Sequence, residues 1–186
     1  MTAHSPGIRE AILAHMVSLS PGQKLGRTAA MKLMYFLQEL QGIELGYDFR
    51  LYTYGPFDSE VLNDLGHAVS HGLLQEKTVL YPRGYGYEIT TGSDVVNPIS
   101  PDILDPTTLQ AISSIVSTFA SLSAAELELK STVLFVDREF KQQGVATLQA
   151  IADRVRDVKP HFTASVILDR VREFSSRGWL QSVPST

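Results

Sequence analysis

Two short β-prone runs joined by a turn rich in proline and glycine constrain most strongly what this chain can fold into. The runs are Thr78–Tyr81 and Tyr87–Thr90, and Pro82–Gly86 joins them. This pattern is typical of a β-hairpin. It comes directly after a predicted helix that ends at Gly72 and continues as Leu73-Leu74. The sequence therefore predicts a helix followed closely by a hairpin.

Three helices are expected before the hairpin. The first follows Ser5-Pro6, which supplies an N-cap and a proline for the first helical turn. The second runs from Thr28 to Gly42, and its apolar residues wrap most of its circumference, so it should be the most buried of the three. The third is capped by Asp58 or Ser59 and ends at Gly72.

A strand is expected between the second and third helices. Residues 47–54 alternate polar and apolar side chains and are rich in aromatics, and Gly55-Pro56 should break the strand. Helices followed by a hairpin in this order predict a winged-helix domain over residues 6–92. The expected fold class is mainly α with a small β-hairpin: a winged-helix N-terminal domain plus a helical C-terminal domain.

The C-terminal half is predicted to be helical. Three proline-containing pairs in residues 93–106 indicate a linker, which is predicted over residues 93–105. Residues 106–182 carry apolar residues at helical spacing. The last helix ends at Gly178-Trp179-Leu180, which echoes the end of the third helix. An alternative interpretation makes these helices a second helix-turn-helix-like unit. The apolar residues of 106–140 could also support a homodimer.

Composition limits the cellular context and the partners. The chain has no cysteine, which excludes disulfides and thiolate metal sites. No stretch is apolar enough to span a membrane, and the N-terminus lacks a signal-peptide pattern. We therefore expect a cytoplasmic protein that does not bind membranes. The net charge of −4 lacks the basic excess typical of nucleic-acid binders.

Catalytic and metal-binding patterns are scarce. The chain has no glycine-rich phosphate loop, no serine-centred nucleophile motif and no carboxylate pair singled out by its spacing. His67 and His71 have the i, i+4 spacing that can present two imidazoles to a metal, with Asp64 one turn earlier. Two histidines on the outer face of a helix are more often solvated. We expect no enzyme activity, no bound metal and no cofactor.

Several motifs in order resemble a known group of proteins. They are Lys32–Gln38, Tyr52–Phe57 and Gly72–Leu74, and the later segments Glu126–Leu129 and Lys159–Phe162 fit the same pattern. The chain resembles the uncharacterised YwgA-like proteins of bacteria and archaea and, more distantly, the Panacea (SocA-like) antitoxin domain. The second resemblance implies an antitoxin-like or adaptor role. The longer helical C-terminal part departs from the Panacea pattern.

The most distinctive short motif is Tyr54-Gly55-Pro56-Phe57. Because proline has no N–H and restricts the residue before it, Gly-Pro should form a rigid corner. In one interpretation, Tyr54 and Phe57 pack against the second helix. In the other, exposed aromatics form a surface for a partner. The partner-binding residues predicted on this basis are Tyr54, Gly55, Pro56, Phe57 and Tyr35.

The third helix of a winged helix normally enters the DNA major groove. Its predicted outer face has two carboxylates and no lysine or arginine, and consists of Glu60, Asn63, Asp64, His67, Ser70 and His71. The hairpin offers Lys77, Arg83 and Tyr85 as nucleic-acid contacts. These features favour a non-catalytic protein that binds a macromolecular partner, and they favour a protein over DNA as that partner. The alternative is a DNA-binding transcriptional regulator.

Overall fold

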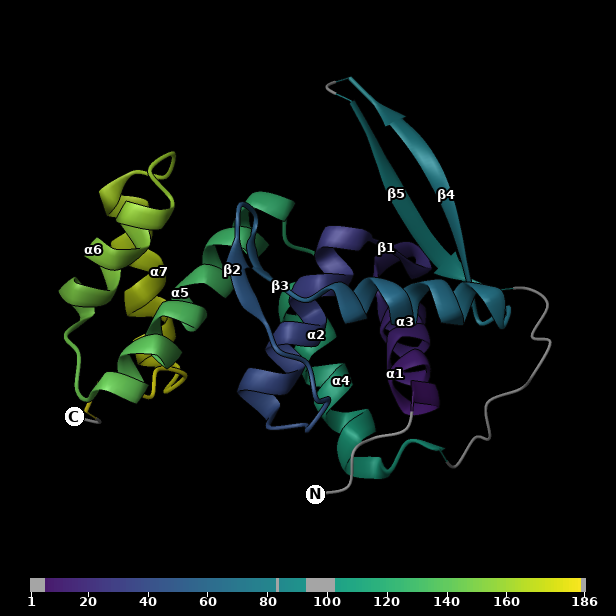
Figure 1. Cartoon of the computed structure of the whole chain (residues 1–186), viewed down its shortest axis with the longest axis horizontal. Helices are drawn as coiled ribbons and strands as arrows, with labels where there is room; N and C mark the ends of the chain where they lie inside the picture. The colour runs from purple at the N-terminus through teal and green to yellow at the C-terminus, as the bar shows by residue number, and fades with distance from the viewer. Residues whose placement is uncertain (1–5, 83, 93–102, 185–186) are drawn as a thin grey trace. The chain divides into compact units, whose positions relative to one another are not determined.

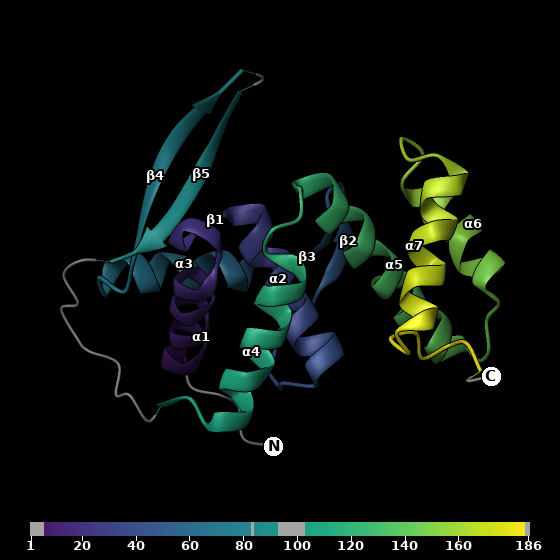
Figure 2. The same cartoon turned by 180° about the vertical axis from the view of Figure 1, so that it is seen from behind.

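The computed structural model describes residues 6–82, 84–92 and 103–184. These residues form seven α-helices and two small β-sheets (Figures 1 and 2). They divide into two compact units: unit 1 consists of Met1–Phe49 and Phe57–Ala124, and unit 2 of Arg50–Pro56 and Ala125–Thr186. The predicted class, mainly helical with a small β component, is confirmed.

Unit 1 combines four helices with a three-stranded sheet. Its helices are α1 (Pro6–Leu19), α2 (Arg27–Gln41), α3 (Ser59–Ser70) and α4 (Pro106–Phe119), and a short 3₁₀ helix, η1 (Pro21–Gln23), follows α1. Its strands are β1 (Lys24–Gly26), β4 (Leu74–Tyr81) and β5 (Gly84–Thr91). They are antiparallel in the order β1-β5-β4, with Leu25 and Glu76 on either side of Ile89.

The helix α2 forms the centre of the unit 1 core. Every residue from Ala30 to Leu37 is buried, including Lys32, in line with the predicted burial of this helix. Phe36 stacks on Phe119 of α4, with ring centroids 4.1 Å apart. Full burial of such a side chain stabilises the fold by about 1.5–3 kcal/mol. Gly42, at φ +67, ends the helix in the left-handed conformation that favours glycine.

The β4–β5 hairpin is longer than the sequence predicted. Gly84, Tyr85 and Gly86 belong to β5 and pair with β4, so the predicted turn over 82–86 is wrong. The ring of Tyr81 covers Gly86, where a Cβ atom would come within 2.9 Å of it. An aromatic ring supplies the packing that a glycine lacks in a strand. In Figures 1 and 2 the hairpin extends away from the helices of unit 1.

The strand predicted over residues 47–54 also differs from the structure. Only Arg50–Tyr52 forms a strand, β2, and after two turn residues the chain continues as β3 (Gly55–Phe57), which pairs with β2. Gly55-Pro56 therefore lies within a strand instead of ending strand structure. A two-stranded sheet leaves one edge of each strand open, so a proline without an N–H fits there.

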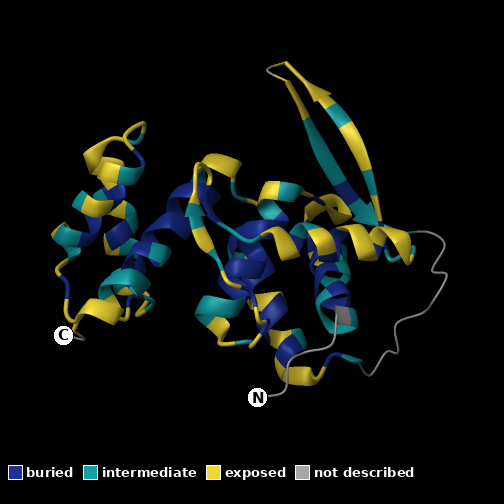
Figure 3. Ribbon diagram, viewed as in Figure 1, coloured by how far each residue is buried: buried dark blue, intermediate teal, exposed yellow. Residues whose placement is uncertain are grey.

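Unit 2 is built around α5 (Ala124–Gln143), with α6 (Leu148–Val158) and α7 (Ala164–Ser176) packed against each other. Every α5 residue from Leu127 to Leu134 is buried (Figure 3). The fully buried carboxylate of Asp137 accepts hydrogen bonds from the backbone N–H groups of Gln181 and Ser182, at 2.9 and 3.0 Å. Asp137 therefore ties the C-terminal segment to α5.

The two units divide the chain differently from the predicted domains. The helix α4 follows the predicted linker, yet it packs on α1 and α2 in unit 1. Residues 50–56 lie inside the predicted winged-helix domain, yet they belong to unit 2. The apolar face of α4, which includes Phe119, finds its partners on α2, and local proline content cannot reveal such partners. Residues 93–102 of the predicted linker lie outside the described residues.

A buried lysine of α5 forms an ion pair with a glutamate of α7. The Lys130 ammonium donates to both carboxylate oxygens of Glu173 at 2.6 Å. Burial alone would raise the pKa of Glu173, but the hydrogen bonds from Lys130 and the charges of Arg170 and Arg177 outweigh burial and lower this pKa. The folded state therefore favours the ionised carboxylate.

We expect Glu173→Gln to destabilise unit 2 at neutral pH by about 2 kcal/mol, because Lys130 would stay buried without its counter-charge. The lowered pKa of Glu173 adds stability above the ordinary glutamate pKa of about 4.5, and this stability is lost as pH falls through the folded-state pKa. The variant should therefore lose less stability in acid than the native protein. Urea unfolding followed by the fluorescence of Trp179, the single tryptophan, measures both effects.

Asp169→Asn on the same helix is the matched control. Its carboxylate is 63% exposed and lies 4.0 Å from Arg172. An exposed pair of this kind contributes about 0–1 kcal/mol, so this variant should unfold almost like the native protein. Equal losses of stability in the two variants would contradict the assignment to Glu173.

Candidate partner-binding site

Residues Arg50–Pro56, here called the strap, form a tight hairpin that belongs to unit 2. Strand β2 leads to the turn residues Thr53 and Tyr54, and β3 leads back toward α3 (Figure 1). The chain enters the strap from Phe49 and leaves it at Phe57, and both of these residues belong to unit 1. Unit 1 is therefore interrupted by a short segment that completes unit 2.

Gly55 brings the strap backbone close to α5. Its φ of +88° lies in the left-handed region that side chains disfavour. A Cβ atom here would lie 3.0 Å from the Ser131 hydroxyl, 3.2 Å from the Thr132 hydroxyl and 3.3 Å from the Glu128 carbonyl oxygen. Backbone angle and close approach therefore both require glycine at this position.

Lys159 holds the tip of the strap. Its side chain is 1% exposed, and its ammonium donates a hydrogen bond to the carbonyl oxygen of Thr53. The same ammonium lies 2.7 Å from a carboxylate oxygen of buried Glu128, at an angle outside hydrogen-bond geometry, so this contact is an ion pair. A buried ammonium is costly unless it is paired and hydrogen-bonded. The Thr53 carbonyl and the Glu128 carboxylate supply what Lys159 needs.

The two tyrosines of the strap face outward. Tyr52 is 62% exposed and Tyr54 is 70% exposed, whereas Gly55 and Pro56 are buried. The predicted packing of Tyr54 against the second helix is therefore wrong. The close approach of the Gly55 backbone to α5 leaves no room for a large inward side chain there. The arrangement matches the other interpretation, a corner that exposes aromatics.

The remaining two predicted partner-binding residues lie in unit 1. Phe57, directly after the strap, is half-buried. Tyr35 is 2% exposed, and its ring packs edge-on against Phe49 with centroids 5.0 Å apart. Tyr35 is therefore a core residue that a partner cannot reach on the folded surface. The structure brings Tyr54, Gly55 and Pro56 together in the strap, whereas Tyr35 belongs to the core of unit 1.

The outer face of α3 is less acidic than predicted. Asp64 is buried, where it accepts a hydrogen bond from the Tyr47 hydroxyl at 2.7 Å and lies 3.0 Å from the Arg9 guanidinium. Burial and that hydrogen bond raise the pKa of Tyr47 above its ordinary value. The placement of Asp64 on the outer face is therefore wrong. The exposed polar residues of α3 include Glu60, Asn63, His67 and Ser70.

The cations near the hairpin lie against carboxylates. Lys77 and Lys24 both contact Glu88, at 2.8 and 3.0 Å, and their hydrogen bonds lower the pKa of Glu88. Arg27 makes a two-pronged ion pair with Glu76, at 2.6 and 2.5 Å, and stacks over the ring of Tyr87. Of the predicted nucleic-acid contacts, Lys77 and Tyr85 are exposed on the hairpin, and Arg83 lies outside the described residues.

Sequence reasoning missed the residues that hold the strap. The sequence predicts no role in holding a loop for Lys159 or Glu128, which lie in two of the segments that resemble the family. Ser131 and Thr132 lie in a helix that was predicted from its apolar residues. Their partners are far away in the chain: Lys159 and Thr53 are separated by 106 residues. The one local signal is a run of polar residues inside the most apolar part of α5.

Within residues 6–82, 84–92 and 103–184, no cluster of three or more histidines and carboxylates is placed to hold a metal ion. In the same residues, no helix has both the length and the apolar character that crossing a membrane requires. No known protein family, no curated protein and no solved structure matches the chain. The resemblance to YwgA-like proteins and the Panacea domain therefore stays a prediction.

We expect Gly55→Ala to destabilise unit 2 by about 2–3 kcal/mol, because the new Cβ is strained by the left-handed backbone and crowds α5. Gly42→Ala is the matched control: Gly42 has φ +67°, but a Cβ there meets nothing within 4 Å. That variant should cost only about 1 kcal/mol, from the backbone alone. Urea unfolding gives both values, and equal costs would contradict the close packing of the strap.

We expect Lys159→Met to loosen the strap, because the Thr53 carbonyl loses its donor and Glu128 keeps only the more distant His161, at 3.5 Å, as an ion-pair partner. Breaking a buried ion pair costs about 3–5 kcal/mol. Chymotrypsin, which cuts after tyrosine, should then cleave at Tyr52 or Tyr54 faster than in the native protein. Lys141→Met is the control, since Lys141 on α5 is exposed and bonds only to the Gln181 side chain among the hydrogen bonds described. An unchanged rate of cleavage in Lys159→Met would contradict the role of Lys159 in holding the strap.

Proposed function

We propose that this chain is a non-catalytic protein that binds another protein through the strap. The observation that carries this proposal is a backbone fixed on its inner side while two tyrosines face solvent. Tyrosine supplies a large contact area and a hydroxyl at low entropic cost. A loop that is already held in place loses less conformational freedom when a partner binds. The strap therefore has the properties of a preorganised contact surface.

We also propose that residues 6–92 take a winged-helix arrangement. Support comes from the order α1, β1, α2, α3, β4, β5 and from the sheet order β1-β5-β4. In this arrangement α3 is the helix that would meet DNA and the β4–β5 hairpin is the wing. The strap enters between α2 and α3, directly before the would-be recognition helix.

The charges near α3 favour a protein partner over DNA. A DNA-binding surface gains most of its affinity from lysines and arginines that contact phosphates. No residue of α3 is a lysine or arginine, and Glu60 on its outer face would repel phosphates. Lys24 and Lys77 share one carboxylate, which leaves a single positive charge at the base of the hairpin. An antitoxin-like or adaptor role, implied by the family resemblance, is consistent with a protein partner.

The second candidate function is a DNA-binding regulator. The observation that favours it is the exposed hairpin, which carries Lys77, Tyr81 and Tyr85 as exposed side chains. Gel shifts on the DNA upstream of the protein's own gene, over a salt series, test this candidate. Tight binding with a steep loss of affinity as salt rises would overturn the protein-partner proposal.

We expect Tyr54→Ser to reduce the recovery of a co-purifying protein by about tenfold or more, since exposed aromatics are frequent hot spots of interfaces. The measurement uses tagged full-length protein in its own cells, with partners identified and then re-tested as purified proteins. Tyr85→Ser is the matched control, because Tyr85 is 69% exposed but lies on the hairpin. Loss of the partner with Tyr85→Ser and retention with Tyr54→Ser would contradict the strap as the contact surface.

A further inference from the structure

The strand β4 offers an open backbone edge. It is the outer strand of the sheet β1-β5-β4, so one of its edges has no strand neighbour among the described residues. It is eight residues long and contains no proline. An open edge of this kind presents N–H and C=O groups that another extended chain can pair with.

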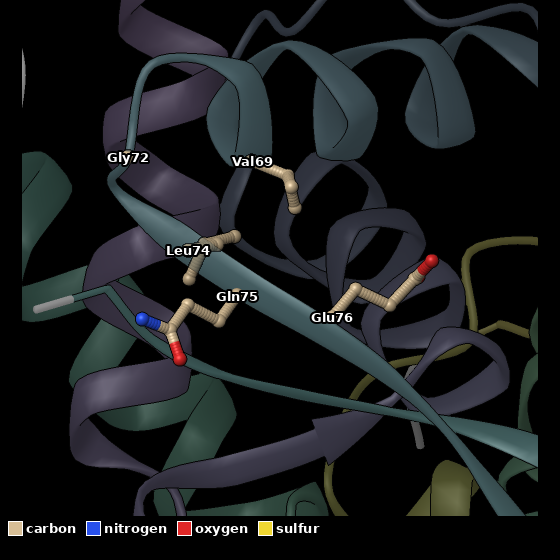
Figure 4. A pocket seen from close by; sticks show the side chains of 5 residues that line it. All are labelled: Val69, Gly72, Leu74, Gln75 and Glu76. Atoms are coloured by element: carbon tan, nitrogen blue, oxygen red, sulfur yellow. The ribbon is translucent and has the colours of Figure 1, made fainter.

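A pocket lies at the foot of this strand. It has a volume of about 390 Å³ and is lined by Val69, Gly72, Leu74, Gln75 and Glu76. Figure 4 shows Val69 projecting from the end of α3 toward β4, which carries the last three of these residues. The pocket combines apolar and polar groups, so it can accept one side chain at the end of an added strand.

Apolar side chains are exposed at the far end of β4. Leu80 is 86% exposed and lies directly across from Tyr85 on the neighbouring strand. Tyr81 and half-buried Val79 lie on the opposite face of the sheet. A partner strand with apolar residues opposite Val79 and Leu80 would cover both faces near the tip.

Lys77 favours an added strand that carries a negative charge. It projects from the same face as Val79, is 67% exposed at its side chain, and shares Glu88 with Lys24 on β1. Two ammonium groups on one carboxylate leave one positive charge uncompensated. A carboxylate in an added strand, opposite Lys77, would neutralise it, and cross-strand pairs of opposite charge stabilise a sheet.

We propose that β4 binds an extended segment of another protein by strand addition, with an acidic residue opposite Lys77 and apolar residues opposite Val79 and Leu80. The backbone edge provides affinity, and the charge and the apolar tip provide selectivity. This surface is separate from the strap, so the inference goes beyond the proposed function. Either surface can fail its test while the other stands.

The probe is a labelled eight-residue peptide, TVVTETTV, designed to pair antiparallel with β4 and to place its glutamate opposite Lys77. We expect it to bind the full-length protein and to slow amide hydrogen exchange in Glu76–Leu80. A TVVTKTTV peptide should bind at least about threefold more weakly, because like charges would face each other. A TVPTEPTV peptide should not bind, since proline removes backbone donors.

Two variants of the protein separate the roles of the lysines. Lys77→Gln should weaken binding of the glutamate peptide by about threefold to fivefold, because it removes the ammonium group that faces the glutamate. Lys24→Gln leaves that ammonium group in place but lets Glu88 neutralise it, so this variant should weaken binding less, by about twofold. The Tyr54→Ser variant should bind the peptide with the affinity of the native protein. The peptide test of β4 therefore remains valid even if the strap does not bind a partner.

Four results would overturn the proposal. One is the absence of protection in β4 at peptide concentrations up to about 1 mM, the weak end of specific binding. Another is an equal effect of Lys77→Gln and Lys24→Gln. A third is protection of β4 without peptide in a protein that sediments as a dimer, which would make a second copy the occupant. The last is displacement of the peptide by duplex DNA at physiological salt.

Discussion

The buried ammonium group of Lys159 is the constraint on which unit 2 depends. A charge that is 1% exposed needs an opposite charge and a hydrogen-bond acceptor inside the protein. Glu128 on α5 provides the first and the Thr53 carbonyl provides the second. Three segments that are distant in sequence are therefore required together, because removal of any one leaves another with an uncompensated polar group.

This constraint also decides which way the strap faces. The backbone occupies the space beside α5, where Gly55 approaches two hydroxyl groups and a carbonyl oxygen. Large side chains of the strap consequently point to solvent, and Tyr52 and Tyr54 do so. The features that make the motif distinctive in sequence, glycine and proline, serve the fold. The exposed tyrosines beside them are the part available to a partner.

Periodicity predicted the elements that depend on local patterns. The burial of α2 followed from apolar residues around its circumference, and the cap at Asp58 and the helix end at Gly42 followed from residue type. Long-range partners were beyond that kind of reasoning. The sequence predicted Asp64 on the outer face of the third helix, but its ion-pair partner Arg9 lies 55 residues earlier in the chain. The sequence predicted that Tyr54-Gly55-Pro56 forms a corner. The direction in which this corner faces depends on the hydrogen bond between Lys159 and the Thr53 carbonyl, and these two residues are 106 residues apart.

The insertion of the strap into unit 2 has a consequence for the order of folding. The contact between Thr53 and Lys159 closes a loop that spans 106 residues, and the entropy lost on closing a loop grows with its length. Most of that loop, Phe57–Ala124, belongs to unit 1. Once those residues have folded, the length of flexible chain that must be closed is much smaller. Joining the strap to the rest of unit 2 therefore costs less entropy after unit 1 has formed. The folding of unit 2 in this way depends on the prior folding of unit 1.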